Sequence, residues 1–135
     1  MSALQPLRVL ILEDQPNDAE LVLDQLRESG FDPEWCRVET SADYLAKLHT
    51  DLHVILADYS LPQFNALQAL HELQQSGLDI PFIVVTGTIS EEAAVECIKR
   101  GAADYLLKDR LARLGPAIVK ALEDKLLRME KRQAE

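Results

Sequence analysis

Five apolar, β-prone runs alternate with helix-like segments along this chain of 135 residues, and the alternation restricts the possible folds most strongly. The predicted strands occupy residues 7–12, 35–39, 53–57, 81–85 and 104–107. Strands that are separated by helical crossovers favour a parallel sheet with helices on both faces. The repeated units share no side-chain signature, which argues against a solenoid.

The apolar content of each run predicts its place in the sheet. Residues 7–12, 53–57 and 81–85 are the most continuously apolar and should lie in the centre. Residues 35–39 alternate in polarity and residues 104–107 form a short run, so both suit the edges. Right-handed crossovers then give the strand order 2-1-3-4-5. The expected fold is a flavodoxin-like (βα)5 doubly wound α/β sandwich with a five-stranded parallel sheet.

Capping residues mark where the helices should begin. The expected caps or first residues are Asn17 or Asp18, Ser41, Asn65, Ser90 and Asp109. The second helix should turn Leu45 and Leu48 inward. In the last helix, an apolar stripe at helical spacing comprises Leu114, Ile118, Leu122, Leu126 and Met129. Its first half should pack on the sheet, and the part beyond about Leu122 should project and either self-associate or lead into another domain.

Polar side chains follow the predicted strands where each strand ends. Residues 53–57 run directly into Asp58, and Pro62 prevents a strand or helix from continuing. The carboxyl ends of parallel strands share one edge of the sheet, where ligands bind in such folds. The groups expected to meet at this edge are Glu13, Asp14, Asp58, Thr86 and Lys108.

Three carboxylates at one site repel each other, and Lys108 supplies only one positive charge. A divalent cation would balance the remainder, and oxygen ligands suit Mg²⁺. No histidine or cysteine stands beside these acids in the sequence, which argues against zinc. Such a site is equipped for phosphoryl transfer, with Asp58 as the in-line nucleophile. The metal and Lys108 would neutralise the phosphoryl oxygens.

The acids, Thr86, Lys108 and Tyr105, at these spacings, resemble a response-regulator receiver domain of the single-domain chemotaxis type. The resemblance covers essentially the whole chain: residues 7–122 would form the receiver domain, after a leader of residues 1–6, and residues 123–135 would extend the last helix. It implies that Asp58 accepts phosphate from a sensor histidine kinase or a histidine phosphotransfer protein. It also implies that Lys108 pairs with the phosphoryl group.

The resemblance further implies a ligand set for Mg²⁺: Asp14, Asp58, the backbone carbonyl of Ser60, and Glu13 through a water molecule. Thr86 would bond a phosphoryl oxygen and Tyr105 would move with it. The face that changes would comprise the fourth helix, fifth strand and fifth helix. This face would bind a downstream protein target or form a homodimer. Such a domain catalyses its own phosphorylation and dephosphorylation and is not a conventional turnover enzyme.

The chain departs from the family pattern at two positions. Asp109 follows Lys108 where the family usually has proline, often after a cis bond. Because a cis bond before another residue type costs about 2.5–4 kcal/mol, we expect a trans bond or a strained cis bond held by the site. Ala66 stands where the family tends to have glycine, which affects the start of the third helix.

Other functions fit the sequence less well. A Mg²⁺-dependent phosphatase with an aspartate nucleophile looks as if it needs Asp-x-Asp where this chain has Glu13-Asp14-Gln15. A flavodoxin-like flavin carrier needs a hydroxyl-rich phosphate loop there, and a receiver that works without phosphate would not need Asp58 and Lys108. The net charge of −9 argues against nucleic acid or an anionic membrane as a partner. With no bilayer-spanning run and no signal-peptide pattern, we expect a cytoplasmic protein.

Overall fold

The computed structural model describes residues 4–88 and 90–134 and contains one parallel sheet in the order β2-β1-β3-β4-β5. Its strands are β1 (Gln5–Leu12), β2 (Phe31–Val38), β3 (Val54–Ala57), β4 (Phe82–Thr86) and β5 (Asp104–Leu107). The predicted flavodoxin-like architecture and strand order are therefore confirmed. Strand β1 begins inside the segment expected to be a leader, because Gln5 and Pro6 pair with Phe31 and Asp32 of β2.

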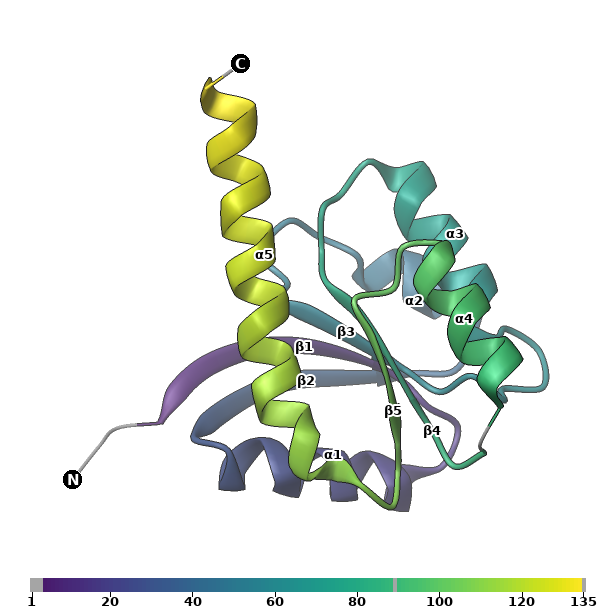
Figure 1. Cartoon of the computed structure of the whole chain (residues 1–135). Helices are drawn as coiled ribbons and strands as arrows, with labels where there is room; N and C mark the ends of the chain where they lie inside the picture. The colour runs from purple at the N-terminus through teal and green to yellow at the C-terminus, as the bar shows by residue number, and fades with distance from the viewer. Residues whose placement is uncertain (1–3, 89, 135) are drawn as a thin grey trace.

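Helices cover both faces of the sheet (Figure 1). They are α1 (Pro16–Glu28), α2 (Ser41–Lys47), α3 (Ala66–Ser76), α4 (Glu91–Lys99) and α5 (Leu114–Ala134), the last preceded by the 3₁₀ turn η1 (Leu111–Arg113). Helices α1 and α5 lie on one face, and α2, α3 and α4 lie on the other. Each face buries its own hydrophobic cluster.

The central strands are apolar throughout because both of their faces are covered. In β1, Val9 and Ile11 pack into the cluster under α1 and α5, whereas Leu10 and Leu12 pack into the cluster under α2 and α3. The same alternation occurs in β3. This double burial holds the carboxyl ends of β1 and β3 side by side, with Leu12 paired to Ala57.

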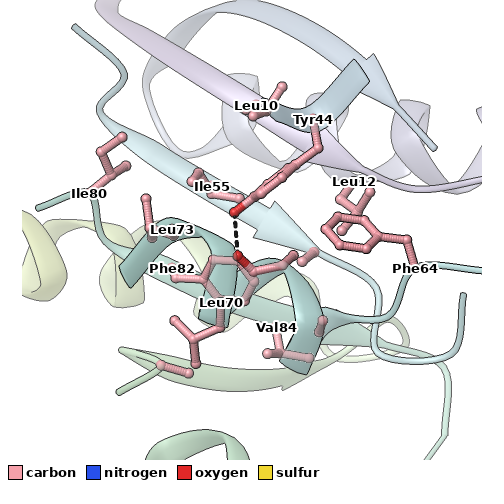
Figure 2. Packing of buried hydrophobic residues seen from close by; sticks show 14 of the residues in the cluster. Leu10, Leu12, Tyr44, Ile55, Phe64, Leu70, Leu73, Ile80, Phe82 and Val84 are labelled. Atoms are coloured by element: carbon pink, nitrogen blue, oxygen red, sulfur yellow. Dashed lines mark hydrogen bonds between the residues drawn. The ribbon is translucent and has the colours of Figure 1, made fainter. Parts of the chain in front are cut away.

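Tyr44 is the largest fully buried side chain of the cluster under α2 and α3 (Figure 2). Its hydroxyl donates a hydrogen bond of 2.8 Å to the carbonyl oxygen of Ala69, and its ring centroid lies 5.3 Å from that of Phe64. The prediction that Leu45 points inward is wrong, since Leu45 is 44% exposed. The face of α2 that meets the core carries Tyr44 instead, and Leu48 packs at its margin.

Replacing Tyr44 with phenylalanine tests the buried hydrogen bond alone. The ring stays, but the carbonyl of Ala69 loses a partner in a site without water access. We expect Tyr44→Phe to lower the free energy of unfolding by about 1 kcal/mol, as measured by urea denaturation. Tyr59→Phe, which removes a hydroxyl from a half-buried ring, is the control. Equal stability of wild type and Tyr44→Phe would contradict the role of this bond.

Two of the predicted helix starts are wrong. Helix α1 begins at Pro16 with Gln15 as the N-cap, so neither Asn17 nor Asp18 caps it. Proline suits the first helical position because its φ is already helical and its missing N–H has no intrahelical partner there. Asp109 does not cap the last helix either, because η1 intervenes before Leu114.

Strand β2 begins at Phe31, four residues earlier than the start predicted at Trp35. It includes Pro33, which an edge strand tolerates because one side of its backbone has no strand partner. Helix α3 starts within one residue of the predicted position: Asn65 is its N-cap, and Ala66 takes the first helical position without positive φ.

Helix α5 divides as the apolar stripe predicts. Leu114 and Ile118 are buried, whereas Leu126 and Met129 are exposed where the helix extends past the sheet (Figure 1). Within the described residues, no helix is both long and apolar enough to span a bilayer.

Candidate functional site

The carboxyl edge of the sheet brings together the ends of β1, β3, β4 and β5. The backbone N–H of Asp58 donates to the carbonyl of Leu12 at 2.9 Å, which fixes Asp58 beside the end of β1. The backbone N–H of Lys108 donates to the carbonyl of Thr86 at 2.8 Å. The backbone hydrogen bonds of the sheet therefore place Asp58 and Lys108 at the same edge.

Lys108 makes ion pairs with three carboxylates. Its Nζ lies 2.6 Å from Oε1 of Glu13, 2.8 Å from Oδ2 of Asp18 and 3.0 Å from Oδ2 of Asp58. No cis peptide bond occurs in residues 4–88 and 90–134, so the bond between Lys108 and Asp109 is trans. The lysine reaches Asp58 without the cis bond that the family pattern suggested.

Burial and neighbouring charges together shift the pKa values of Glu13 and Lys108. Burial raises the pKa of Glu13 to about 7. The hydrogen bond from Lys108 works in the opposite direction and lowers this pKa, whereas the nearby charge of Asp58 raises it further. Burial alone would lower the pKa of Lys108, but its hydrogen bonds with Asp18, Glu13 and Asp58 raise it above its usual range. The lysine is therefore a permanent cation, and Glu13 resists ionisation.

Glu13, Asp14 and Asp58 form a set of possible metal ligands, with one carboxylate oxygen from each lying within 4.8 Å of the others. Glu13 and Asp58 are buried and Asp14 is half-buried. Three oxygen donors around one point fit a hard cation such as Mg²⁺. The backbone N–H of Ser60 donates to Oδ1 of Asp58 at 3.1 Å, so the loop after β3 folds back over the acid.

Thr86, at the end of β4, and Tyr105, in β5, both contact Thr88 in the loop that follows β4. The hydroxyl oxygen of Thr86, which is fully buried, lies 3.2 Å from that of Thr88. The hydroxyl of Tyr105 donates to the carbonyl of Thr88 at 3.3 Å, and its ring packs edge-on against Tyr59 with centroids 6.5 Å apart. The switching roles of Thr86 and Tyr105 stay predictions.

Two residues of the site, Asp18 and Thr88, are not predicted from the sequence. The sequence pattern suggests Asp18 only as a helix cap, yet its carboxylate accepts a hydrogen bond from Lys108 across 90 residues of sequence. A signal was present, because an acid in the first turn of the helix after β1 stands next to the same sheet edge. Thr88 had no comparable signal, because its link to Thr86, Ser60 and Tyr105 depends on the path of one loop.

Comparisons with known proteins agree with this geometry. A family model described as the response regulator receiver domain matches residues 9–119. The transcriptional regulatory protein BaeR of Escherichia coli O6:H1 is 33% identical over 116 residues, 85% of this chain and 47% of BaeR. The phosphate regulon transcriptional regulatory protein PhoB of Escherichia coli K12 is 32% identical over 104 residues, 75% of this chain and 44% of PhoB. The chain thus spans less than half the length of these two relatives.

A solved structure extends the comparison to three dimensions. A response regulator receiver domain protein from Clostridium thermocellum superposes with a TM-score of 0.77 at 22% identity, covering 90% of this chain and 98% of that one. At this identity the likeness shows a shared fold.

Proposed function

Because the chain belongs to the response regulator receiver domain family, we propose that Asp58 accepts a phosphoryl group from a sensor histidine kinase or a histidine phosphotransfer protein. One observation supports this role above the others. The Nζ atom of Lys108 lies 3.0 Å from the carboxylate of Asp58 at the open edge of a parallel sheet. A lysine there can bind phosphoryl oxygens as the acid is modified.

The transfer uses an oxygen of Asp58 as the nucleophile. This oxygen attacks phosphorus, the bond from phosphorus to the donor's histidine nitrogen breaks, and the electron pair stays on that nitrogen. Lys108 donates hydrogen bonds to the phosphoryl oxygens and Thr86 offers a hydroxyl. Asp14, Asp58 and the backbone carbonyl of Ser60, with Glu13 acting through a water molecule, would hold Mg²⁺. The ion would neutralise developing charge on the phosphoryl oxygens.

The same groups serve hydrolysis of the aspartyl phosphate. A water oxygen attacks phosphorus and gives up a proton to solvent, the bond between phosphorus and the oxygen of Asp58 breaks, and inorganic phosphate leaves while the carboxylate recovers its electron pair. The chain would then catalyse its own phosphorylation and dephosphorylation in the cytoplasm. It would not act as a conventional turnover enzyme.

The proposed output is a change in the face formed by α4, β5 and α5. Phosphorylation adds charge and acceptor oxygens next to Thr86, whose movement would be accompanied by that of Tyr105. On α4, Val95 and Ile98 are 57% and 47% exposed, which suits contact with a protein target or with a second copy of the chain.

Acetyl phosphate tests the proposed function without knowledge of the kinase. Wild-type protein incubated with acetyl phosphate and Mg²⁺ should gain the mass of one phosphoryl group, and Asp58→Asn should gain none. Asp14→Asn should also gain little, because it removes a proposed metal ligand. A wild type without an adduct, or an undiminished adduct on Asp58→Asn, would contradict the proposal.

An aspartate-nucleophile phosphatase is not favoured. The segment after β1 is Glu13-Asp14-Gln15, and it lacks the Asp-x-Asp pattern that is typical of such enzymes. The family match over residues 9–119 supports the receiver function instead.

A further inference from the structure

Asp18 contacts Lys108 from a different element than the other two carboxylates. It lies in the first turn of α1, and its Oδ2 is 2.8 Å from Nζ of Lys108. Glu13 and Asp58 approach the same ammonium group from the ends of β1 and β3. Asp18 is not among the clustered carboxylates that could hold a metal ion. Its contact therefore concerns the lysine.

Three carboxylates surround the ammonium group of Lys108, and two of them, Asp18 and Asp58, accept hydrogen bonds from it. A lysine ammonium has three N–H donors, and Glu13, Asp18 and Asp58 each lie within hydrogen-bonding distance of it. A phosphoryl group on Asp58 needs at least one of these donors. Modification of Asp58 frees the donor that this acid now holds, and a second donor for the new oxygens requires that Glu13 or Asp18 give way.

Exposure identifies the partner that gives way. The side chains of Glu13 and Asp58 are 5% and 10% exposed, whereas that of Asp18 is 34% exposed. A half-buried carboxylate regains hydration when it turns outward, and a buried one does not. Asp18 is also dispensable for holding the metal, whereas Glu13 and Asp58 both belong to that cluster.

We propose that Asp18 is a positioning residue that competes with the phosphoryl group for Lys108 and so slows phosphorylation of Asp58. This inference rests on the proposed function. The site has a formal charge of −3 when its four carboxylates are ionised and Lys108 is protonated. These carboxylates are Glu13, Asp14, Asp18 and Asp58. Each phosphoryl donor is itself an anion, so the fourth carboxylate adds repulsion as well as occupying a donor.

The bonds made and broken are those of the transfer to Asp58. With acetyl phosphate as donor, an oxygen of Asp58 bonds to phosphorus, the bond from phosphorus to the acetyl oxygen breaks, and acetate leaves with the electron pair. Asp18 forms no covalent bond. The carboxylate of Asp18 exchanges its hydrogen bond with Lys108 for hydrogen bonds with water. Lys108 then donates to a phosphoryl oxygen instead.

Asp18→Asn tests this competition, and Asp24→Asn is its matched control. Both changes remove one negative charge from α1, but Asp24 is 66% exposed and pairs with Arg27 at 3.2 Å. Initial rates of phosphorylation should be measured by intact mass over a range of acetyl phosphate concentrations with Mg²⁺. We expect Asp18→Asn to react about three- to tenfold faster than wild type, mainly through a lower KM, and Asp24→Asn to match wild type.

Two further measurements separate competition from a structural effect. Beryllium trifluoride, an anionic mimic of the phosphoryl group, should bind Asp18→Asn more tightly by a similar factor. Asp18→Glu keeps the charge and should keep the wild-type rate. Thermal unfolding of each variant verifies that the compared proteins are folded.

The outcomes distinguish this inference from the proposed function. If wild type is phosphorylated and Asp18→Asn is no faster than Asp24→Asn, the role of Asp18 is overturned and the proposed function stands. A slower Asp18→Asn also overturns it, because Asp18 would then assist Lys108. If wild type gains no phosphoryl group, the proposed function fails and this inference fails with it.

Discussion

Lys108→Met is expected to lower the free energy of unfolding by about 3 kcal/mol at pH 8 without divalent cations. Methionine keeps the unbranched side chain as far as Cε but removes the ammonium group that pairs with the carboxylates of Glu13, Asp18 and Asp58. Two of these carboxylates are buried, so their repulsion is poorly screened by water. Urea denaturation followed by far-ultraviolet circular dichroism measures the effect.

Lys120→Met is the matched control for Lys108→Met. Lys120 is 76% exposed and pairs with Asp124, at 3.1 Å, on the surface of α5. Its replacement should change the free energy of unfolding by no more than about 0.5 kcal/mol. Similar stability losses for the two variants, or a Lys108→Met variant as stable as wild type, would contradict the electrostatic role of Lys108.

Glu13→Gln is expected to stabilise the protein at pH 8 by about 1–3 kcal/mol without divalent cations. The pKa of Glu13 is raised from 4.5 to about 7, so the folded state binds this proton more tightly than the unfolded state. Wild-type stability should therefore fall as the pH rises through this window, and the loss is complete above the folded pKa. Glutamine stays neutral and keeps most of the shape of the side chain.

The pH dependence is the measurement for Glu13→Gln. Urea denaturation at several pH values between 5 and 8 should show a falling free energy of unfolding for wild type and a flatter profile for Glu13→Gln. Glu20→Gln, on the exposed face of α1, should keep the wild-type profile. A Glu13→Gln protein less stable than wild type at pH 8 would contradict the raised pKa.

The sheet and most of the site could be predicted because they depend on short-range patterns. Parallel strands bury both faces, so apolar runs mark them, and the residue after each run must lie at the same edge. Asp58 follows β3 directly and Glu13 follows β1 directly, which leaves little freedom in their placement. Lys108 follows β5 directly, so its position at this edge is determined in the same way.

The misplaced elements depended on competition between local signals. Asn17 and Asp18 are good capping residues, but Pro16 favours the first helical position. Helix α1 therefore begins at Pro16, before both of them. This shift freed Asp18 for Lys108, which no pattern within α1 could predict. Leu45 and Tyr44 are neighbours in sequence, and only the contact of α2 with Phe64 and Ala69 decides which one is buried.

Borohydride reduction after phosphorylation tests the central claim most directly, because it converts an aspartyl phosphate into homoserine at the modified position. Wild-type protein treated with acetyl phosphate and Mg²⁺, reduced and digested, should contain homoserine at position 58 and aspartate at position 14. The unphosphorylated protein should contain aspartate at both positions. Homoserine at position 14, or an adduct that leaves position 58 unreduced, would contradict Asp58 as the phosphoacceptor.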